Sequence, residues 1–164
     1  MAYHFLVQQI LDLLKENNCW FETFEHEPVL TSEEAAKTRP EYTIHQGAKA
    51  ILAKIERSDK TKSFVLFVIP GDLRFDSKKV KLSLNLKNVR FASEEELAEI
   101  THGVLRGAVP PFGNLFDIPV YVDKKVLENE KIVFNAGDRC FSVGMKSKDY
   151  EMLVRPQVVD IVVG

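Results

Sequence analysis

The chain has 164 residues and a formal net charge of −2. Apolar residues make up 45% and charged residues 28%, which is close to the globular average and excludes a disordered tail, a collagen-like chain and a coiled-coil rod. Proteins that grip long duplex nucleic acid usually carry a basic surplus, so we expect any nucleic-acid contact here to be local or assisted by a partner.

The cysteines and the N-terminal sequence indicate in which compartment we expect the protein. Cys19 and Cys140 are too few for a disulfide scaffold and fit no zinc module, so we expect reduced thiols in a cytoplasmic protein. The N-terminus lacks the features of a signal peptide, and no stretch approaches the roughly 18 apolar residues of a membrane span. The chain has no internal repeat or long linker, which predicts one domain over residues 1–164.

The first half of the chain predicts two helices and three strands. Apolar spacing predicts a helix over residues 3–17, and an aromatic-rich run predicts a strand over 20–24. A short helix follows, capped by Thr31 or Ser32 and closed by Pro40. The apolar runs 48–55 and 64–69 predict strands, and Pro70-Gly71-Asp72 predicts a turn.

The second half predicts shorter elements around an irregular segment. Residues 76–84 predict a helix, 89–91 a strand, and the capping box at 93–96 a helix to about Thr101. The irregular segment covers residues 103–114, strands follow at 120–122, 132–134 and 141–145, Ser147 caps a helix through Leu153, and a strand covers 158–163. Because strands and helices alternate without a strict βαβ rhythm, we expect an α+β fold with a mixed sheet.

Common catalytic motifs are missing from the sequence. It has no G-x-S-x-G elbow, no H-E-x-x-H and no P-loop. No two of the four histidines have metal-ligand spacing, so we expect no metal site. Cys140 is a candidate nucleophile, although nothing near it in the sequence would activate its thiol.

The segment from Gly103 to Gly113 combines glycine and proline with apolar residues. Glycine lets a backbone approach a ligand and aim its N–H groups at an oxyanion, while proline fixes the shape of the loop. The alternative is a rigid connector that packs on the core.

One isolated lysine and one basic stretch each allow two interpretations. Lys49 lies between Ala48 and Ala50 in an apolar run, where it either snorkels at a strand edge or points into a cleft. The local basic surplus of Lys78, Lys79, Lys81, Lys87 and Arg90 is either a solvated helix face or a landing patch for a phosphate backbone.

Taken together, these motifs resemble the YbaK/prolyl-tRNA synthetase-associated domain family, whose free-standing and inserted members deacylate mischarged tRNA. The resemblance runs nearly end to end and is carried by residues 23–28, 47–50, 64–72, 107–111 and 134–137. It implies an α+β fold with a compact, mixed and mostly antiparallel β-barrel or sheet flanked by helices. It implies no cofactor.

The resemblance also implies roles for individual residues. Lys49 corresponds to the active-site lysine that holds the terminal ribose or phosphate region, and Gly107 belongs to the loop that positions the ester carbonyl and stabilises its oxyanion. Ser142 matches a side chain that selects the amino acid. The other substrate-binding candidates are Phe24, His26, Ala108, Val109, Pro110, Pro111, Phe112, Asn135, Gly137 and Met145, and Lys78, Lys79 and Lys81 are candidate tRNA contacts.

The implied reaction is hydrolysis of the ester of a mischarged tRNA, such as tRNA-Pro. Phe24 and Ser142 depart from the cysteine-removing branch, and the stretch Lys49-Ala50-Ile51-Leu52 departs from the Lys-Asn-Leu-Phe-like motif of the alanine-removing branch. The amino acid therefore stays open among alanine, cysteine, serine and threonine. The implied partners are the acceptor end of tRNA and an aminoacyl-tRNA synthetase, without DNA, for a monomer or weak homodimer. The alternative is a non-catalytic module that binds an aminoacyl or nucleotide-like ligand or a synthetase-associated partner.

Overall fold

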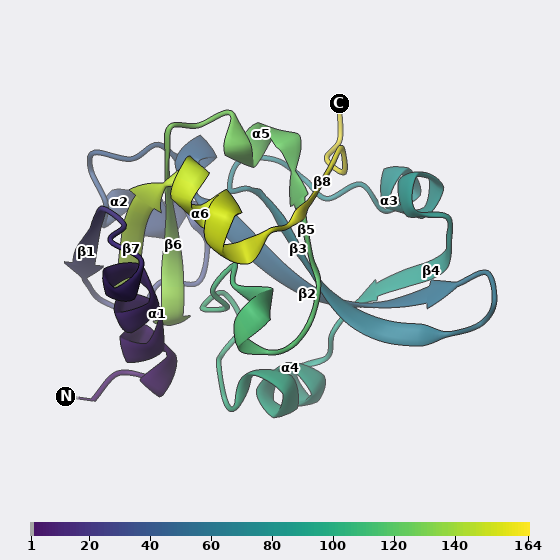
Figure 1. Cartoon of the computed structure of the whole chain (residues 1–164), viewed down its shortest axis with the longest axis horizontal. Helices are drawn as coiled ribbons and strands as arrows, with labels where there is room; N and C mark the ends of the chain where they lie inside the picture. The colour runs from purple at the N-terminus through teal and green to yellow at the C-terminus, as the bar shows by residue number, and fades with distance from the viewer. Residues whose placement is uncertain (1) are drawn as a thin grey trace.

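The computed structural model describes residues 2–164, which form two β-sheets with helices around them (Figure 1). The smaller sheet is antiparallel, in the order β1 (Phe21–Glu25), β7 (Phe141–Lys146), β6 (Lys131–Asp138). The larger sheet has the order β4 (Leu86–Phe91), β2 (Ala48–Arg57), β3 (Lys62–Pro70), β5 (Val120–Asp123), β8 (Gln157–Val159). An isolated parallel bridge between Gly47 and Val133 links the start of β2 to β6.

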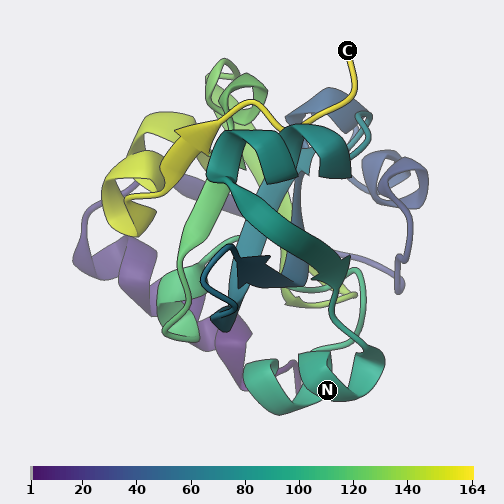
Figure 2. The ribbon, with the colours of Figure 1, turned by 90° about the vertical axis from the view of Figure 1, so that its right-hand side faces the viewer.

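The helices lie around both sheets. They are α1 (Phe5–Glu16), α2 (Ser32–Lys37), α3 (Ser77–Leu84), α4 (Glu94–Thr101), α5 (Lys124–Leu127) and α6 (Ser147–Val154), with 3-10 turns η1 (Ile44–Gln46) and η2 (Gly113–Leu115). In Figure 1, α1 and α2 lie at the end with the smaller sheet, and α3 lies with β4 at the opposite end. Figure 2 views the molecule from that opposite end, with α3 and β4 in front.

The main core shows which side chains of the smaller sheet face α1. Leu6 and Ile10 of α1 pack in one buried cluster with Phe134 of β6 and Val143 of β7. Because successive side chains of a strand point to opposite faces, the neighbours of these residues point away from α1. A second buried cluster lies on the far face of the larger sheet, beneath α3.

The predicted α+β class and mixed, mostly antiparallel sheet are confirmed. Four strand pairs are antiparallel, and the pairs β3–β5 and β5–β8 are parallel. The predicted helices and strands lie within a few residues of those observed, and the side chain of Thr31 caps α2.

Three local expectations are wrong. Ser147 is the first residue of α6 and not its cap, because its hydroxyl donates to the carbonyl of Asn129. The last strand ends at Val159, and Val162 makes an isolated bridge to Phe75. The short elements η1 and α5 were not expected from the sequence.

The longest helix, α1, has 12 residues. Within residues 2–164, no helix combines the length and apolar character needed to cross a membrane. Cys19 and Cys140 are both free thiols.

Candidate functional site

Three of the predicted site residues share one face of the smaller sheet. Phe24 of β1 and Asn135 of β6 are both register partners of Ser142 in β7. Register partners point to the same face, and the burial of Phe134 and Val143 against α1 puts this face on the opposite side. We call the face that carries Phe24, Asn135 and Ser142 the outer face.

A chain of hydrogen-bonding contacts crosses the outer face to the glycine-rich loop. His26 Nε2 lies 2.7 Å from Ser142 Oγ, and Ser142 Oγ lies 3.0 Å from Asn135 Oδ1. Asn135 Nδ2 donates to the Gly107 carbonyl at 2.8 Å. Four residues that the sequence singled out are therefore in contact, although they come from distant segments.

Arg39, which the sequence did not point to, completes this network. Its Nη1 donates to Ser142 Oγ at 3.3 Å, and its Nε donates to the Ala35 carbonyl at 3.1 Å. The side chain is buried at 5% exposure, and none of the ion pairs among residues 2–164 includes it. Burial lowers the pKa of Arg39 to about 10, so the guanidinium stays charged at neutral pH.

The hydrogen of the Ser142 hydroxyl is used inside the protein. The Glu27 carbonyl accepts from His26 Nδ1 at 2.9 Å, so in a neutral His26 ring Nε2 is an acceptor. The single hydroxyl hydrogen then faces two acceptors, His26 Nε2 and Asn135 Oδ1, while Arg39 donates to the oxygen. Ser142 is also 0% exposed, so it has the spacing of a nucleophile beside a base but no access to an ester.

The glycine-rich loop is held by its carbonyl groups. The Arg106 carbonyl accepts from Arg139 Nε, and the Gly107 carbonyl accepts from Asn135 Nδ2, both at 2.8 Å. The Ala108 carbonyl accepts from the Gly137 N–H at 2.9 Å, and the Pro111 carbonyl accepts from the Tyr150 hydroxyl at 2.6 Å. Within residues 2–164, the N–H groups of Gly107 and Val109 have no hydrogen-bond partner. The loop is thus fixed by its carbonyl groups, while these two N–H groups are unpaired within residues 2–164.

Both glycines near this loop are required by geometry. Gly107 has φ +86°, and an added Cβ would lie 3.1 Å from the Leu30 carbonyl oxygen. Gly137 has φ +96°, and its added Cβ would lie 2.8 Å from Leu6 Cβ. Gly107 is exposed at the loop surface, whereas Gly137 permits close packing of β6 on α1.

Lys49 lies exposed near the start of β2. Ala48 and Ala50 on either side of it belong to the main core or pack against it, so the side chain of Lys49 points the other way. The parallel bridge from Gly47 to Val133 places Lys49 and Asn135 each two residues beyond it. Lys49 therefore lies close to the outer face. Among residues 2–164, its side-chain ammonium has no hydrogen bond or ion pair.

The apolar substrate-binding candidates of the loop and Met145 are buried. Phe112 and Met145 are both 0% exposed in the main core, where Phe112 stacks edge-on against Phe134 and Tyr150. The other loop candidates, Ala108, Val109, Pro110 and Pro111, are buried as well. These side chains shape the loop from beneath, because the loop packs its apolar side on the core.

The basic stretch lies far from the outer face. The candidate contacts Lys78, Lys79 and Lys81 are on α3, at the opposite end of the molecule (Figure 1). Lys79 pairs with Asp160 at 3.3 Å, and two further members of the stretch also pair with carboxylates. Partial neutralisation favours a solvated helix face over a phosphate-binding patch.

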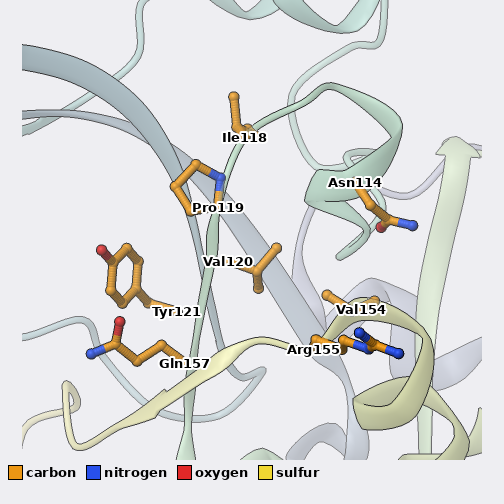
Figure 3. A pocket seen from close by; sticks show the side chains of 8 residues that line it. All are labelled: Asn114, Ile118, Pro119, Val120, Tyr121, Val154, Arg155 and Gln157. Atoms are coloured by element: carbon orange, nitrogen blue, oxygen red, sulfur yellow. The ribbon is translucent and has the colours of Figure 1, made fainter.

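A surface hollow of about 250 Å³ lies elsewhere on the molecule (Figure 3). Asn114 and Ile118 form one rim, and Arg155 and Gln157 form the other (Figure 3). No residue that the sequence singled out lines it, and it holds no pair of groups with acid–base or nucleophilic spacing. On the outer face, in contrast, Arg39 from the segment after α2 lies against Ser142, and both side chains are buried.

Cys140 is poorly suited to be a nucleophile. Burial raises the pKa of its thiol, and the Asp138 carboxylate raises it further. The reactive form of cysteine is the thiolate, which both effects disfavour.

Comparison with known proteins identifies relatives of the whole chain. The model of a family described as the aminoacyl-tRNA editing domain matches residues 26–153. The multifunctional Ser/Thr-tRNA deacylase ProXp-y of Escherichia coli K12 is 29% identical over 154 residues, which are 93% of this chain and 90% of the relative. A proline–tRNA ligase of Shouchella clausii is 31% identical over 90 residues, covering 53% of this chain and 15% of the ligase.

Solved structures share the fold. A crystal structure described as a candidate trans-editing enzyme for prolyl-tRNA synthetase superposes with a TM-score of 0.80 at 22% identity, covering 99% of this chain and 100% of the other.

Proposed function

Because the chain belongs to the aminoacyl-tRNA editing domain family, we propose that it is a trans-acting deacylase that hydrolyses the ester of a tRNA carrying a small wrong amino acid. The observation that carries the proposal is the fixed glycine-rich loop. Its Gly107 and Val109 N–H groups are unpaired within residues 2–164, and they lie beside the polar network of the outer face. Two backbone donors with no other partner suit a carbonyl oxygen that becomes negative.

In the proposed reaction, the oxygen of a water molecule attacks the ester carbonyl carbon. The bond from that carbon to the ribose oxygen then breaks, and the ribose oxygen takes a proton from the attacking water. Placing water and ester together lowers the barrier by about 7–11 kcal/mol, and one oxyanion donor lowers it by about 3–4 kcal/mol. The activated ester needs no protein nucleophile on this account, and the neighbouring ribose hydroxyl of the tRNA assists.

We assign Lys49 to the RNA end of the substrate. Its ammonium is exposed, unpaired within residues 2–164, and close to the outer face, so it attracts the terminal ribose and phosphate region without a competing carboxylate. Arg139, which donates to the Arg106 carbonyl at the loop, adds positive charge at the same end, whereas Arg106 pairs with Glu94 at 3.7 Å. We propose that residues 1–164 act as one editing domain and that the acceptor end of tRNA is the partner.

The burial of the polar residues on the outer face supports a small amino acid. Ser142 is 0% exposed and Arg39 is 5% exposed, so we expect that a small side chain reaches them more readily than a large aromatic one. The E. coli relative carries serine and threonine in its name, and these residues are within the range of small side chains that the sequence leaves open. We infer that seryl or threonyl esters are the main substrates, on tRNA-Pro or another tRNA.

The ligase relative supports a proposal of a synthetase-associated role. The matched part of the ligase covers 15% of its length, as expected for one domain within a larger enzyme. We propose that the free-standing chain, as a monomer or weak dimer, receives tRNA released by such a synthetase.

The second candidate is a binding module without turnover, and the covered outer face is the observation that favours it. Release of amino acid from a panel of seryl-, threonyl-, alanyl- and cysteinyl-tRNA by the purified chain separates the two. Turnover of at least one ester supports the deacylase, whereas saturable binding with no release supports the module. Cys140→Ala should retain turnover, since its thiol is not placed to attack.

A further inference from the structure

We propose that Arg39, and not Ser142, selects the amino acid, by donating a hydrogen bond to an oxygen atom on the substrate's side chain. This inference rests on the proposed deacylase function. It concerns the deep part of the site beneath α2, where Arg39 and Ser142 lie in contact.

Ser142 has no hydrogen left to donate to a ligand. Its oxygen contacts His26, Asn135 and Arg39 at 2.7 to 3.3 Å, and a hydroxyl has one hydrogen and two lone pairs. At 0% exposure it also has no open side. A substrate would have to break one of these contacts to reach it.

Arg39, in contrast, has donors left over. A guanidinium carries five N–H bonds in a rigid fork, and the two contacts found here use one on Nε and one on Nη1. Nη2 makes no hydrogen bond, yet no sealed side-chain nitrogen or oxygen among residues 2–164 lacks a partner. Nη2 is therefore not fully sealed, and it offers a pair of fixed donors at the one open edge of the group.

The charge of Arg39 decides what it can bind. No carboxylate within residues 2–164 pairs with the guanidinium. The buried cation can therefore donate hydrogen bonds to an oxygen acceptor of the substrate, and it repels the substrate's α-ammonium group. A nucleotide phosphate is too large and too well hydrated to reach a side chain at 5% exposure. Since the ester carbonyl is assigned to the loop N–H groups, the remaining acceptor on a small aminoacyl ester is a side-chain hydroxyl oxygen, as in serine and threonine.

Pairs of isosteric esters test this directly. Serine and 2-aminobutyrate differ by a hydroxyl in place of a methyl, and so do threonine and valine. On the same tRNA, we expect kcat/KM to favour the hydroxyl member of each pair by roughly 10- to 150-fold, the range that one hydrogen bond to a charged group supplies. Arg39→Met keeps much of the length of the side chain but has no donors, and we expect it to lower this preference to about threefold or less.

The controls keep the outcomes apart. Arg57→Met removes an arginine that bonds to Ser63 at the far end of β2, and it should leave the preference unchanged. Should Arg39→Met fail to fold, Arg39→Lys decides, because a lysine cannot hold Ala35 and Ser142 and also reach a third oxygen. A wild-type chain that shows no preference, or a preference that survives in the folded Arg39 variant, overturns the inference. A wild-type chain that hydrolyses none of the esters overturns the proposed function itself.

Discussion

Lys49 tests whether the RNA end of the site lies where we place it. We expect Lys49→Ala to lower kcat/KM for the preferred ester to less than about a tenth, because a cation that meets anionic RNA contributes attraction and little packing. Its exposed position predicts that the free energy of unfolding changes by only about 0.5 kcal/mol. Deacylation assays and thermal melts measure the two effects.

The control for Lys49 is Lys54→Ala in the same strand. Lys54 lies over the ring of Phe64, further along β2 from the site. It should keep full activity. A Lys49→Ala protein that is both inactive and unfolded would indicate a structural lysine instead.

Gly107 tests the carbonyl-binding loop. Gly107→Val places a branched side chain at φ +86° and against the Leu30 carbonyl, which should shift the N–H groups and lower kcat by about 100-fold, the effect of losing one oxyanion donor. Single-turnover rates measure this. Gly103→Val is a matched control, since its φ is +93° but nothing lies within 4 Å of an added Cβ. Equal losses in both variants would mean that backbone strain, and not the site, is responsible.

Single residues show where sequence reasoning reached its limit. His26, Asn135, Gly107 and Ser142 were singled out through motifs, and the structure joins them in one network. The sequence around Arg39 contains no motif that indicates a site residue. Its burial depends on how α2 packs on the outer face and not on its neighbours in the chain. Phe112 was expected at the ligand for its place in the loop, but an apolar loop can equally face the core.

Helices with strong local signals were predicted well. In α1 the buried residues recur at helical spacing, and in α4 the capping box of Ser93 and Glu96 is present as expected. The short α5 and η1 carry no such periodicity, since four or three residues give less than two turns. The Ser147 side chain was misassigned because a tertiary partner, the Asn129 carbonyl, competes with the cap.

The start of α4 should be sensitive to acid. Arg90 and the Ser93 N–H hold the pKa of Glu96 at about 2, below its ordinary value of 4.5. A carboxyl group with a lowered pKa stabilises the folded state above the ordinary value, and this contribution is lost as the pH falls from about 4.5 to about 2. The difference in Tm between wild type and Glu96→Gln should therefore be constant near neutral pH and shrink in acid. Glu99→Gln in the same helix should show no such trend, and a Glu96 difference that persists at pH 2 would contradict this origin.

The two sheets divide the molecule into a site end and a far end. The outer face collects residues from 24–39, 107, 135 and 142, whereas the basic stretch lies on α3 and β4 at the opposite end (Figure 1). The alternation of β6 and β7 indicates which residues share a face. It does not indicate which face α1 takes, so the sequence could not tell that Met145 points into the core and Ser142 points away from it.

The covered outer face implies that α2 moves when substrate binds. α2 has six residues and one buried side chain, Ala35, so little apolar burial holds it in place. Segments with few buried contacts open most readily. We expect the backbone amides of residues 29–42 to exchange hydrogen faster than those of β6 and β7 in the free protein.

A stable 3′-amide of serine and adenosine should slow exchange in this segment, because the ligand fills the space beneath α2 and fixes Arg39. α3 lies at the opposite end of the molecule (Figure 1) and should show no change. Saturation with the amide that leaves exchange of residues 29–42 unaltered would mean that the aminoacyl group binds elsewhere.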